Sequence, residues 1–139
     1  MRQQWTVWKE FRFEAAHMLE GHDGKCARLH GHSWVGRVYL TGNYLQAVGS
    51  KKEMLIDFGT VKDMLITPVV EQFLDHHYLN ETLATNRPTS EMVAQFLFKF
   101  FEARLKELAA TLKNVGADLV RVSAVEIEET CTSGCRYER

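Results

Sequence analysis

The sequence predicts an α+β fold in which antiparallel strands and two helices share a core. Residues 5–17 alternate between apolar and polar side chains, whereas residues 89–112 repeat apolar side chains at helical spacing. A period of two indicates a strand with one buried face, and a period near 3.6 indicates an amphipathic helix. Polar, glycine-containing loops separate such segments. The expected order of elements is strand, strand, strand, helix, helix, strand.

Three strands are expected in the first half of the chain. The first covers residues 5–17, and its apolar phase includes Phe13 and Ala15. After a loop over residues 18–29, the second strand covers about residues 30–41. The short apolar run at residues 54–58 is expected to form the third strand.

The second half is expected to form two helices and a last strand. Residues 59–74 repeat apolar side chains every four positions, and Pro68 is expected to kink or split this helix because it lacks an N–H donor. The longest helix is expected to begin after Thr89, its N-cap residue, and to end before Gly116. The last strand, residues 119–129, changes apolar phase near its middle, which indicates a bulge or a strand buried on both faces.

The composition of the chain limits the classes of protein to which it can belong. The 139 residues are 45% hydrophobic and 25% charged, which is typical of one soluble globular domain, expected here to span residues 1–139. The formal net charge of −1 gives no electrostatic case for a nucleic-acid partner. No apolar run reaches the ~18 residues of a membrane span, and residues 1–5 lack the apolar region of a signal peptide. We therefore expect a cytoplasmic protein without a membrane partner.

Histidines give the strongest indication of chemistry. His30 and His32 stand two residues apart on a predicted strand, so their side chains share a face. His17, at the end of the neighbouring strand, is the natural third member. Three imidazoles with one open position are typical of a catalytic zinc site. Isolated histidine pairs are also common as ordinary core or surface residues, and we expect that role for His22.

Other chemically active residues lie near these histidines in sequence. Cys26 precedes His30 by four residues, so it could be a reactive thiolate, a zinc ligand or a small buried residue. Asp75 and His76 suit general acid–base catalysis, although adjacent residues of an extended chain point in opposite directions, so spacing alone also fits solvated surface residues.

Three residues near the C-terminus complete the set. Glu129 ends an apolar phase, so its carboxylate is either buried to pair with a multi-donor ligand or marks the exit of the strand into water. Cys131 and Cys135 give only a weak metal signal, and we expect free thiols because the compartment is expected to be reducing.

Together these segments resemble the family of 6-pyruvoyltetrahydropterin and 6-carboxytetrahydropterin synthases. The resemblance covers nearly the whole chain and rests on motifs in a specific order and spacing. These motifs are Phe13-Glu14-Ala15-Ala16-His17, Lys25-Cys26-Ala27-Arg28-Leu29-His30-Gly31-His32, Met54-Leu55-Ile56-Asp57-Phe58, Asp75-His76-His77-Tyr78-Leu79-Asn80, Pro88-Thr89-Ser90-Glu91, and Glu129-Thr130 with Tyr137.

The resemblance implies a tunnelling fold (T-fold), in which a four-stranded antiparallel sheet packs on two helices. Subunits of such proteins join their sheets into a barrel, usually as a homohexamer built from two trimers with active sites at subunit interfaces. Closure of the barrel also removes exposed strand edges.

The resemblance also implies roles for individual residues. His17, His30 and His32 resemble the ligands of a Zn²⁺ cofactor. Cys26 resembles the catalytic thiol, and Asp75 and His76 resemble its acid–base partners, which the resemblance implies another subunit supplies. Glu129 resembles the anchor of the pterin ring, with Thr89 and Glu91 in a second pterin-contacting segment. Lys25, Arg28 and Arg87 are candidates for binding the triphosphate because they are close to these motifs.

Three residues separate Cys26 from His30, and this short spacing resembles the 6-carboxy enzymes of 7-deazaguanine (queuosine) biosynthesis. The resemblance implies a lyase that converts 7,8-dihydroneopterin triphosphate to 6-carboxy-5,6,7,8-tetrahydropterin, acetaldehyde and triphosphate. The alternatives are a 6-pyruvoyltetrahydropterin synthase, a non-catalytic zinc- and pterin-binding T-fold protein, and, ranked last, an unrelated zinc hydrolase.

Overall fold

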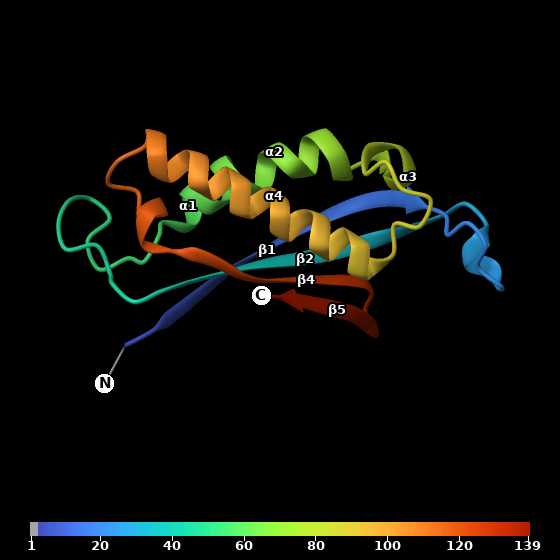
Figure 1. Cartoon of the computed structure of the whole chain (residues 1–139), viewed down its shortest axis with the longest axis horizontal. Helices are drawn as coiled ribbons and strands as arrows, with labels where there is room; N and C mark the ends of the chain where they lie inside the picture. Colours follow the sequence, from blue (N-terminus) through green and yellow to red (C-terminus); the bar gives the residue numbers. More distant parts are fainter. Residues whose placement is uncertain (1–2) are drawn as a thin grey trace.

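A sheet and a layer of helices form the protein in a computed structural model that describes residues 3–139 (Figure 1). The sheet has the order β3-β1-β2-β4-β5. Its strands are β1 (Trp5–His17), β2 (His30–Gly42), β3 (His77–Tyr78), β4 (Arg121–Thr130) and β5 (Ser133–Glu138). All neighbouring pairs are antiparallel except β1 and β3. The α+β prediction is confirmed, with four antiparallel strands and a two-residue parallel strand at the β1 edge.

The two longest strands follow the predicted pattern. β1 has the predicted bounds, and β2 extends one residue beyond the predicted end. Phe11 and Phe13 are buried under the helices, and Phe13 stacks on the fully buried Trp34 at 5.7 Å between ring centroids. Gly36 faces Phe11 across the two strands, where an added Cβ would come within 2.4 Å of the ring. The aromatic side chains therefore fix how closely β1 and β2 pack.

The expected third strand is wrong. Residues 54–57 form no regular element, and α1 (Phe58–Thr60) begins directly after them. Leu55 and Ile56 are buried, but the Asp57 side chain accepts a hydrogen bond from the Gly59 N–H and so caps a helix. The apolar run therefore packs into the core without forming a strand. The fourth antiparallel strand of the sheet is β5.

The first helical segment is irregular around Pro68. It consists of α1, a π-helical stretch (Val61–Ile66), α2 (Thr67–Val69) and a second π-helical stretch (Val70–Leu74). Pro68 lies in α2, so the hydrogen-bond pattern changes on both sides of it, as the prediction of a split helix requires. Val61, Leu65, Val69 and Leu74 are buried, which matches the apolar spacing.

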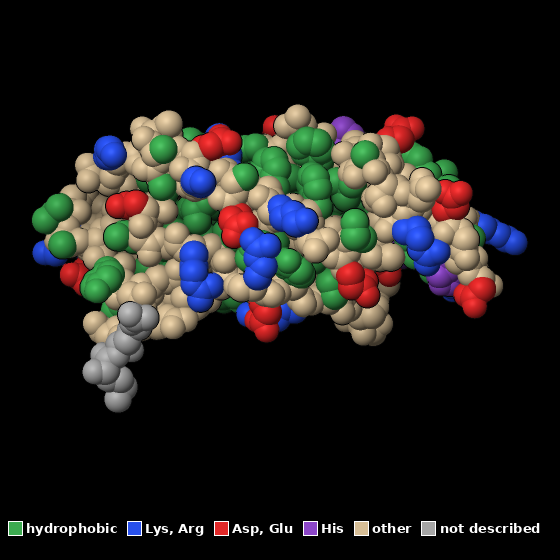
Figure 2. Space-filling view, in the orientation of Figure 1, with side chains coloured by type: hydrophobic (Ala, Val, Ile, Leu, Met, Phe, Trp, Pro, Cys, Tyr) green, Lys and Arg blue, Asp and Glu red, His purple; other side chains and the backbone are tan. Residues whose placement is uncertain are grey.

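The longest helix is α4 (Ser90–Thr111), and the short α3 (Leu79–Thr82) precedes it. The Thr89 hydroxyl accepts a hydrogen bond from the Met92 N–H at 3.1 Å, which confirms the predicted N-cap. The helix ends five residues before Gly116. Gly116 has a φ of 90° and precedes a short 3₁₀ turn (Ala117–Leu119). The predicted apolar stripe is largely buried, although Leu112 is exposed. Hydrophobic side chains gather over the helical layer in Figure 2.

The last strand contains the predicted irregularity. Tyr39 of β2 pairs with Ala124 and Leu40 pairs with Val122, so Ser123 is the extra residue of a β-bulge. A second shift lies between Glu128 and Thr130, where β4 pairs with β5. Bulges re-aim side chains, and this second one determines where Glu129 points.

Among the described residues, no helix covers the opposite face of the sheet, as Figure 1 shows. Arg37 on β2 pairs with Glu10 and Glu128 at 3.1 and 3.0 Å, and Arg136 pairs with Glu126 at 3.1 Å. Polar residues on this face and apolar residues on the other give each long strand its alternating pattern.

Within residues 3–139, no helix is both long and apolar enough to cross a bilayer. Met1 and Arg2, which belong to the segment that was compared with a signal peptide, lie outside the described residues.

The N-cap of α4 gives a test of the fold. Replacing Thr89 with alanine removes the acceptor for the Met92 N–H and is expected to lower the free energy of unfolding by about 1 kcal/mol. Thr89→Asp supplies another capping acceptor and is expected to recover most of this loss. Urea denaturation of the three proteins measures both effects, and a Thr89→Ala protein as stable as the parent would contradict the assignment.

Candidate metal centre and active site

Three histidines converge at the end of the sheet where β1 stops and β2 starts. His17 pairs directly with His30 across the strands, and His32 follows two residues later on the same face. The three ring centroids lie 4.6, 4.9 and 5.1 Å apart. One donor atom from each ring lies within 4.8 Å of the others, so this group could hold a metal ion.

Backbone carbonyls orient two of these rings. His17 Nδ1 lies 2.8 Å from the Pro88 carbonyl oxygen, and His30 Nδ1 lies 2.6 Å from the Arg28 carbonyl oxygen. A carbonyl accepts only, so each Nδ1 donates and each Nε2 keeps a free lone pair. Such outer hydrogen bonds fix the tautomer of a metal-binding histidine.

The remaining nitrogens fit a cation rather than a hydrogen-bond partner. The Nε2 atoms of His17 and His32 are buried and have no hydrogen-bond partner. Burial lowers the pKa of both imidazoles, which favours the neutral form that coordinates metals. Unpartnered buried polar atoms are costly, and a divalent metal ion would satisfy both. The donor set therefore fits the metal that the sequence suggested.

Asp75 and His76 form a second polar group, the acid–base pair, which is bonded to the backbone of Glu14 in β1. Asp75 Oδ2 lies 3.0 Å from His76 Nδ1, and its Oδ1 accepts a hydrogen bond from the Glu14 N–H at 2.8 Å. These hydrogen bonds hold the pKa of Asp75 below its usual value, with the Glu14 N–H as the largest cause. The sequence left open whether Asp75 touches His76, and the structure shows that it does.

His76 has an unusual backbone conformation. Its φ is 60°, in the left-handed region that non-glycine residues rarely adopt, and its N–H donates to the Glu14 carbonyl at 2.6 Å. Backbone strain of this kind collects at functional sites. The side chain is 79% exposed and lines, together with His32, a cavity of about 500 Å³. The wall of this cavity thus contains one histidine of the metal group, His32, and one member of the acid–base pair, His76.

The comparisons with known proteins agree with this geometry. Residues 6–139 match the family model described as 6-pyruvoyl tetrahydropterin synthase. The chain belongs to this family. It is 45% identical to a 6-carboxy-5,6,7,8-tetrahydropterin synthase from Synechocystis sp. over 96% of this chain and 92% of that protein. A Haemophilus influenzae protein of the same name is 34% identical over 94% of this chain and 96% of its own.

Solved structures of the family share the fold. The 6-pyruvoyl tetrahydropterin synthase of Caenorhabditis elegans superposes with a TM-score of 0.73 at 26% identity, covering 100% of this chain and 99% of that one. The T-fold expectation is therefore confirmed.

Cys26 lies in a short 3₁₀ turn (Lys25–Ala27) between the first two strands and is partly buried. Its carbonyl accepts a hydrogen bond from the Leu19 N–H at 2.8 Å, which closes the loop that follows His17. Within residues 3–139, the group able to hold a metal consists of the three histidines and does not include Cys26. The thiol thus remains available for the catalytic role that family resemblance implies.

A hydrogen-bond network that the sequence did not reveal fixes this loop. Asn80 bonds both the N–H and the carbonyl of Met18, the residue after His17, at 3.0 and 2.9 Å. Arg87 donates to the Glu20 carbonyl at 2.6 Å. Main-chain carbonyls such as that of Pro88 leave no side-chain signal in a sequence, so these contacts could not be predicted. Arg87, one of the three residues expected to bind the triphosphate, thus also holds the loop that follows His17.

Of the expected pterin-binding residues, Glu129 lies close to the metal group. Glu129 Oε1 lies 3.3 Å from His17 Nε2 and 3.7 Å from His32 Nε2. Glu91 is in the first turn of α4, whereas the Thr89 hydroxyl already caps that helix. Burial raises the pKa of Cys135, with smaller contributions from Glu91 and Glu129. Cys135 therefore shares the neighbourhood of both carboxylates.

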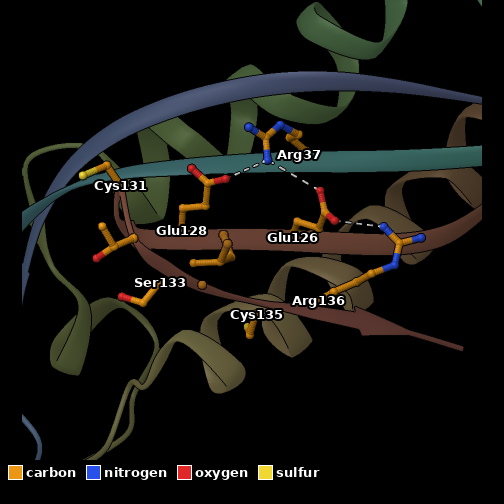
Figure 3. A pocket seen from close by; sticks show the side chains of 10 residues that line it. Arg37, Glu126, Glu128, Cys131, Ser133, Cys135 and Arg136 are labelled. Atoms are coloured by element: carbon orange, nitrogen blue, oxygen red, sulfur yellow. Dashed lines mark hydrogen bonds and ion pairs between the residues drawn. The ribbon is translucent and has the colours of Figure 1, made fainter.

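The remaining sequence candidates are not members of the three-histidine group found within residues 3–139. Cys131 and Cys135 are free thiols, as expected. They border a second cavity of about 420 Å³ whose charged walls include Arg37, Glu128 and Arg136 (Figure 3). His22 lies near Asp23. In this second cavity the charged side chains already pair with one another, so it offers no unpaired charge to a ligand.

Proposed function

We propose that this protein is a zinc-dependent 6-carboxy-5,6,7,8-tetrahydropterin synthase that acts on 7,8-dihydroneopterin triphosphate. The observation that carries the proposal is the 45% identity to a relative of that name, over nearly the whole of both chains. The histidine group, with two unpartnered Nε2 atoms, supplies a fitting metal site.

The donor chemistry supports zinc as the metal. Neutral imidazoles are common zinc ligands, and catalytic zinc sites combine three protein ligands with one exchangeable position. His17, His30 and His32 would hold the ion. When bound, it would supply Lewis-acid stabilisation of negative charge on oxygens of the substrate side chain.

Cys26 and the Asp75–His76 pair would move the protons. The Cys26 thiolate would take a proton from a carbon of the substrate side chain. Asp75 holds His76 Nδ1 at 3.0 Å, so the exposed Nε2 of His76 can deliver a proton to the pterin ring. Elimination of triphosphate, followed by cleavage of the side chain with one water molecule supplying the second carboxyl oxygen, would then release acetaldehyde.

Carboxylates would orient the pterin. The donor groups of its 2-amino-pyrimidinone edge suit an acceptor such as Glu129, with Glu91 and the Thr89 segment nearby. Holding the ring in this way brings the proton-transfer groups within hydrogen-bond distance. Lys25, Arg28 and Arg87, all near the loop after His17, would neutralise the triphosphate.

The cell context of the proposal is 7-deazaguanine (queuosine) biosynthesis in the cytoplasm. Residues 1–139 would form a single domain. The small-molecule substrate would be its ligand, without nucleic acid or membrane partners.

The product identifies the reaction. Zinc-loaded protein incubated with 7,8-dihydroneopterin triphosphate is expected to yield acetaldehyde and 6-carboxytetrahydropterin, identified by mass spectrometry. A pyruvoyl product that retains all side-chain carbons would instead assign the activity named in the family description. Metal binding without any turnover would favour a zinc- and pterin-binding protein.

Matched cysteine variants control this experiment. Cys26→Ala is expected to lower kcat by at least ~100-fold, as is usual on loss of a group that transfers a proton. Cys131→Ala removes an exposed thiol of the β4–β5 turn and is expected to keep normal turnover. Equal turnover by both variants would remove Cys26 from the mechanism.

Assembly gives an independent prediction. The outer edge of β5 and residues 5–14 of β1 pair with no further strand within the described chain. Head-to-tail pairing of these edges would close sheets into a barrel, which supports a homohexamer built from two trimers. Light scattering is expected to give a mass near six chains, and a monomer at micromolar concentration would contradict this assembly.

A further inference from the structure

The Glu129 carboxylate lies directly at the metal-binding nitrogens, a position that binding of a pterin ring does not require. Its Oε1 atom is 3.3 Å from His17 Nε2 and 3.7 Å from His32 Nε2. We propose that Glu129 is a fourth, displaceable ligand of the metal ion that His17, His30 and His32 hold.

The distances suit shared coordination better than hydrogen bonding. A charge-assisted N–H···O bond usually measures about 2.7–2.9 Å, and neither Nε2 atom has a hydrogen-bond partner in the structure. In a tetrahedral zinc site with bonds of about 2.0–2.2 Å, two ligand atoms stand roughly 3.3–3.6 Å apart. One Glu129 oxygen thus lies at about the ligand–ligand spacing from two of the three nitrogens.

The strand geometry explains why this glutamate, among three neighbouring glutamates, reaches the site. Glu128 pairs with Gly134 and Thr130 with Ser133, so Glu129 is the unpaired residue of the bulge. Its side chain follows the buried phase of Ile127, whereas Glu128 points to the other face and bonds Arg37 at 3.0 Å. The bulge therefore aims a single carboxylate at the histidines.

The proposal deepens the proposed function and rests on it. Without substrate, Glu129 would close the fourth coordination position. When a pterin binds, its amino-pyrimidinone edge would draw the carboxylate away, and the freed position would accept an oxygen of the substrate side chain. One residue would thereby couple recognition of the ring to opening of the metal site.

Metal affinity tests the first half of this inference without any turnover. Zinc competition with a chromogenic chelator is expected to show at least tenfold weaker binding for Glu129→Gln than for the parent protein. Glu128→Gln, the neighbouring carboxylate on the opposite face, is the matched control and is expected to bind zinc normally. Glu129→Asp keeps a shorter carboxylate and is expected to fall between the two.

Cobalt spectroscopy tests the displacement. The visible bands of the Co²⁺-loaded parent protein are expected to change when oxidised neopterin, which cannot react, is added. The Glu129→Gln protein is expected to differ from the parent before the addition and to respond less to it.

The results separate this inference from the proposed function. Unchanged zinc affinity and cobalt bands in folded Glu129→Gln would overturn the ligand role, even if its turnover were lost. If neopterin left the cobalt bands of the parent protein unchanged, the proposed displacement of Glu129 would be wrong. Failure of the zinc-loaded parent to form 6-carboxytetrahydropterin would overturn the proposed function alone.

Discussion

The pairing of β1 with β2 is the constraint on which the site depends. Its register sets His17 opposite His30 and Ala15 opposite His32, so all three imidazoles emerge on one face. A shift of one residue would turn one strand's histidines to the other side of the sheet. The register is secured by the core, because the buried Trp34 indole donates to the Ala15 carbonyl at 3.1 Å. Packing and metal binding therefore use the same pairs of residues.

The helical layer completes the site from the other side. The Pro88 carbonyl immediately before α4 orients His17, and Thr89, the N-cap of α4, fixes where that helix begins. At the β3 edge, Asp75 and His76 are tied to the backbone of Glu14. Two elements distant in sequence thus hold the metal group and the acid–base pair against the end of β1. The arrangement thus places backbone supports behind the groups to which we assign metal binding and proton transfer.

Alternation and spacing predicted much of this arrangement. The bounds of β1, the N-cap Thr89 and the face shared by His30 and His32 all follow from local periodicity, which a sequence displays directly. The expected strand at residues 54–58 failed because Asp57 caps a helix, a local hydrogen bond that outweighs a short apolar run. β5 was missed because only Cys135 and Tyr137 face inward along it. The contact of Asp75 with His76 depends on the left-handed backbone of His76, which cannot be predicted from residue type.

The central claim, that three imidazoles and an oxygen hold the catalytic ion, is tested most directly by X-ray absorption of the zinc-loaded protein. We expect nitrogen and oxygen ligands at about 2.0–2.2 Å from the zinc ion, with imidazole scattering from three rings. A sulfur scatterer at about 2.3 Å would contradict it. Such a result would make a cysteine a zinc ligand, and its loss in Cys26→Ala would identify Cys26 and remove it as the thiolate that takes the substrate proton.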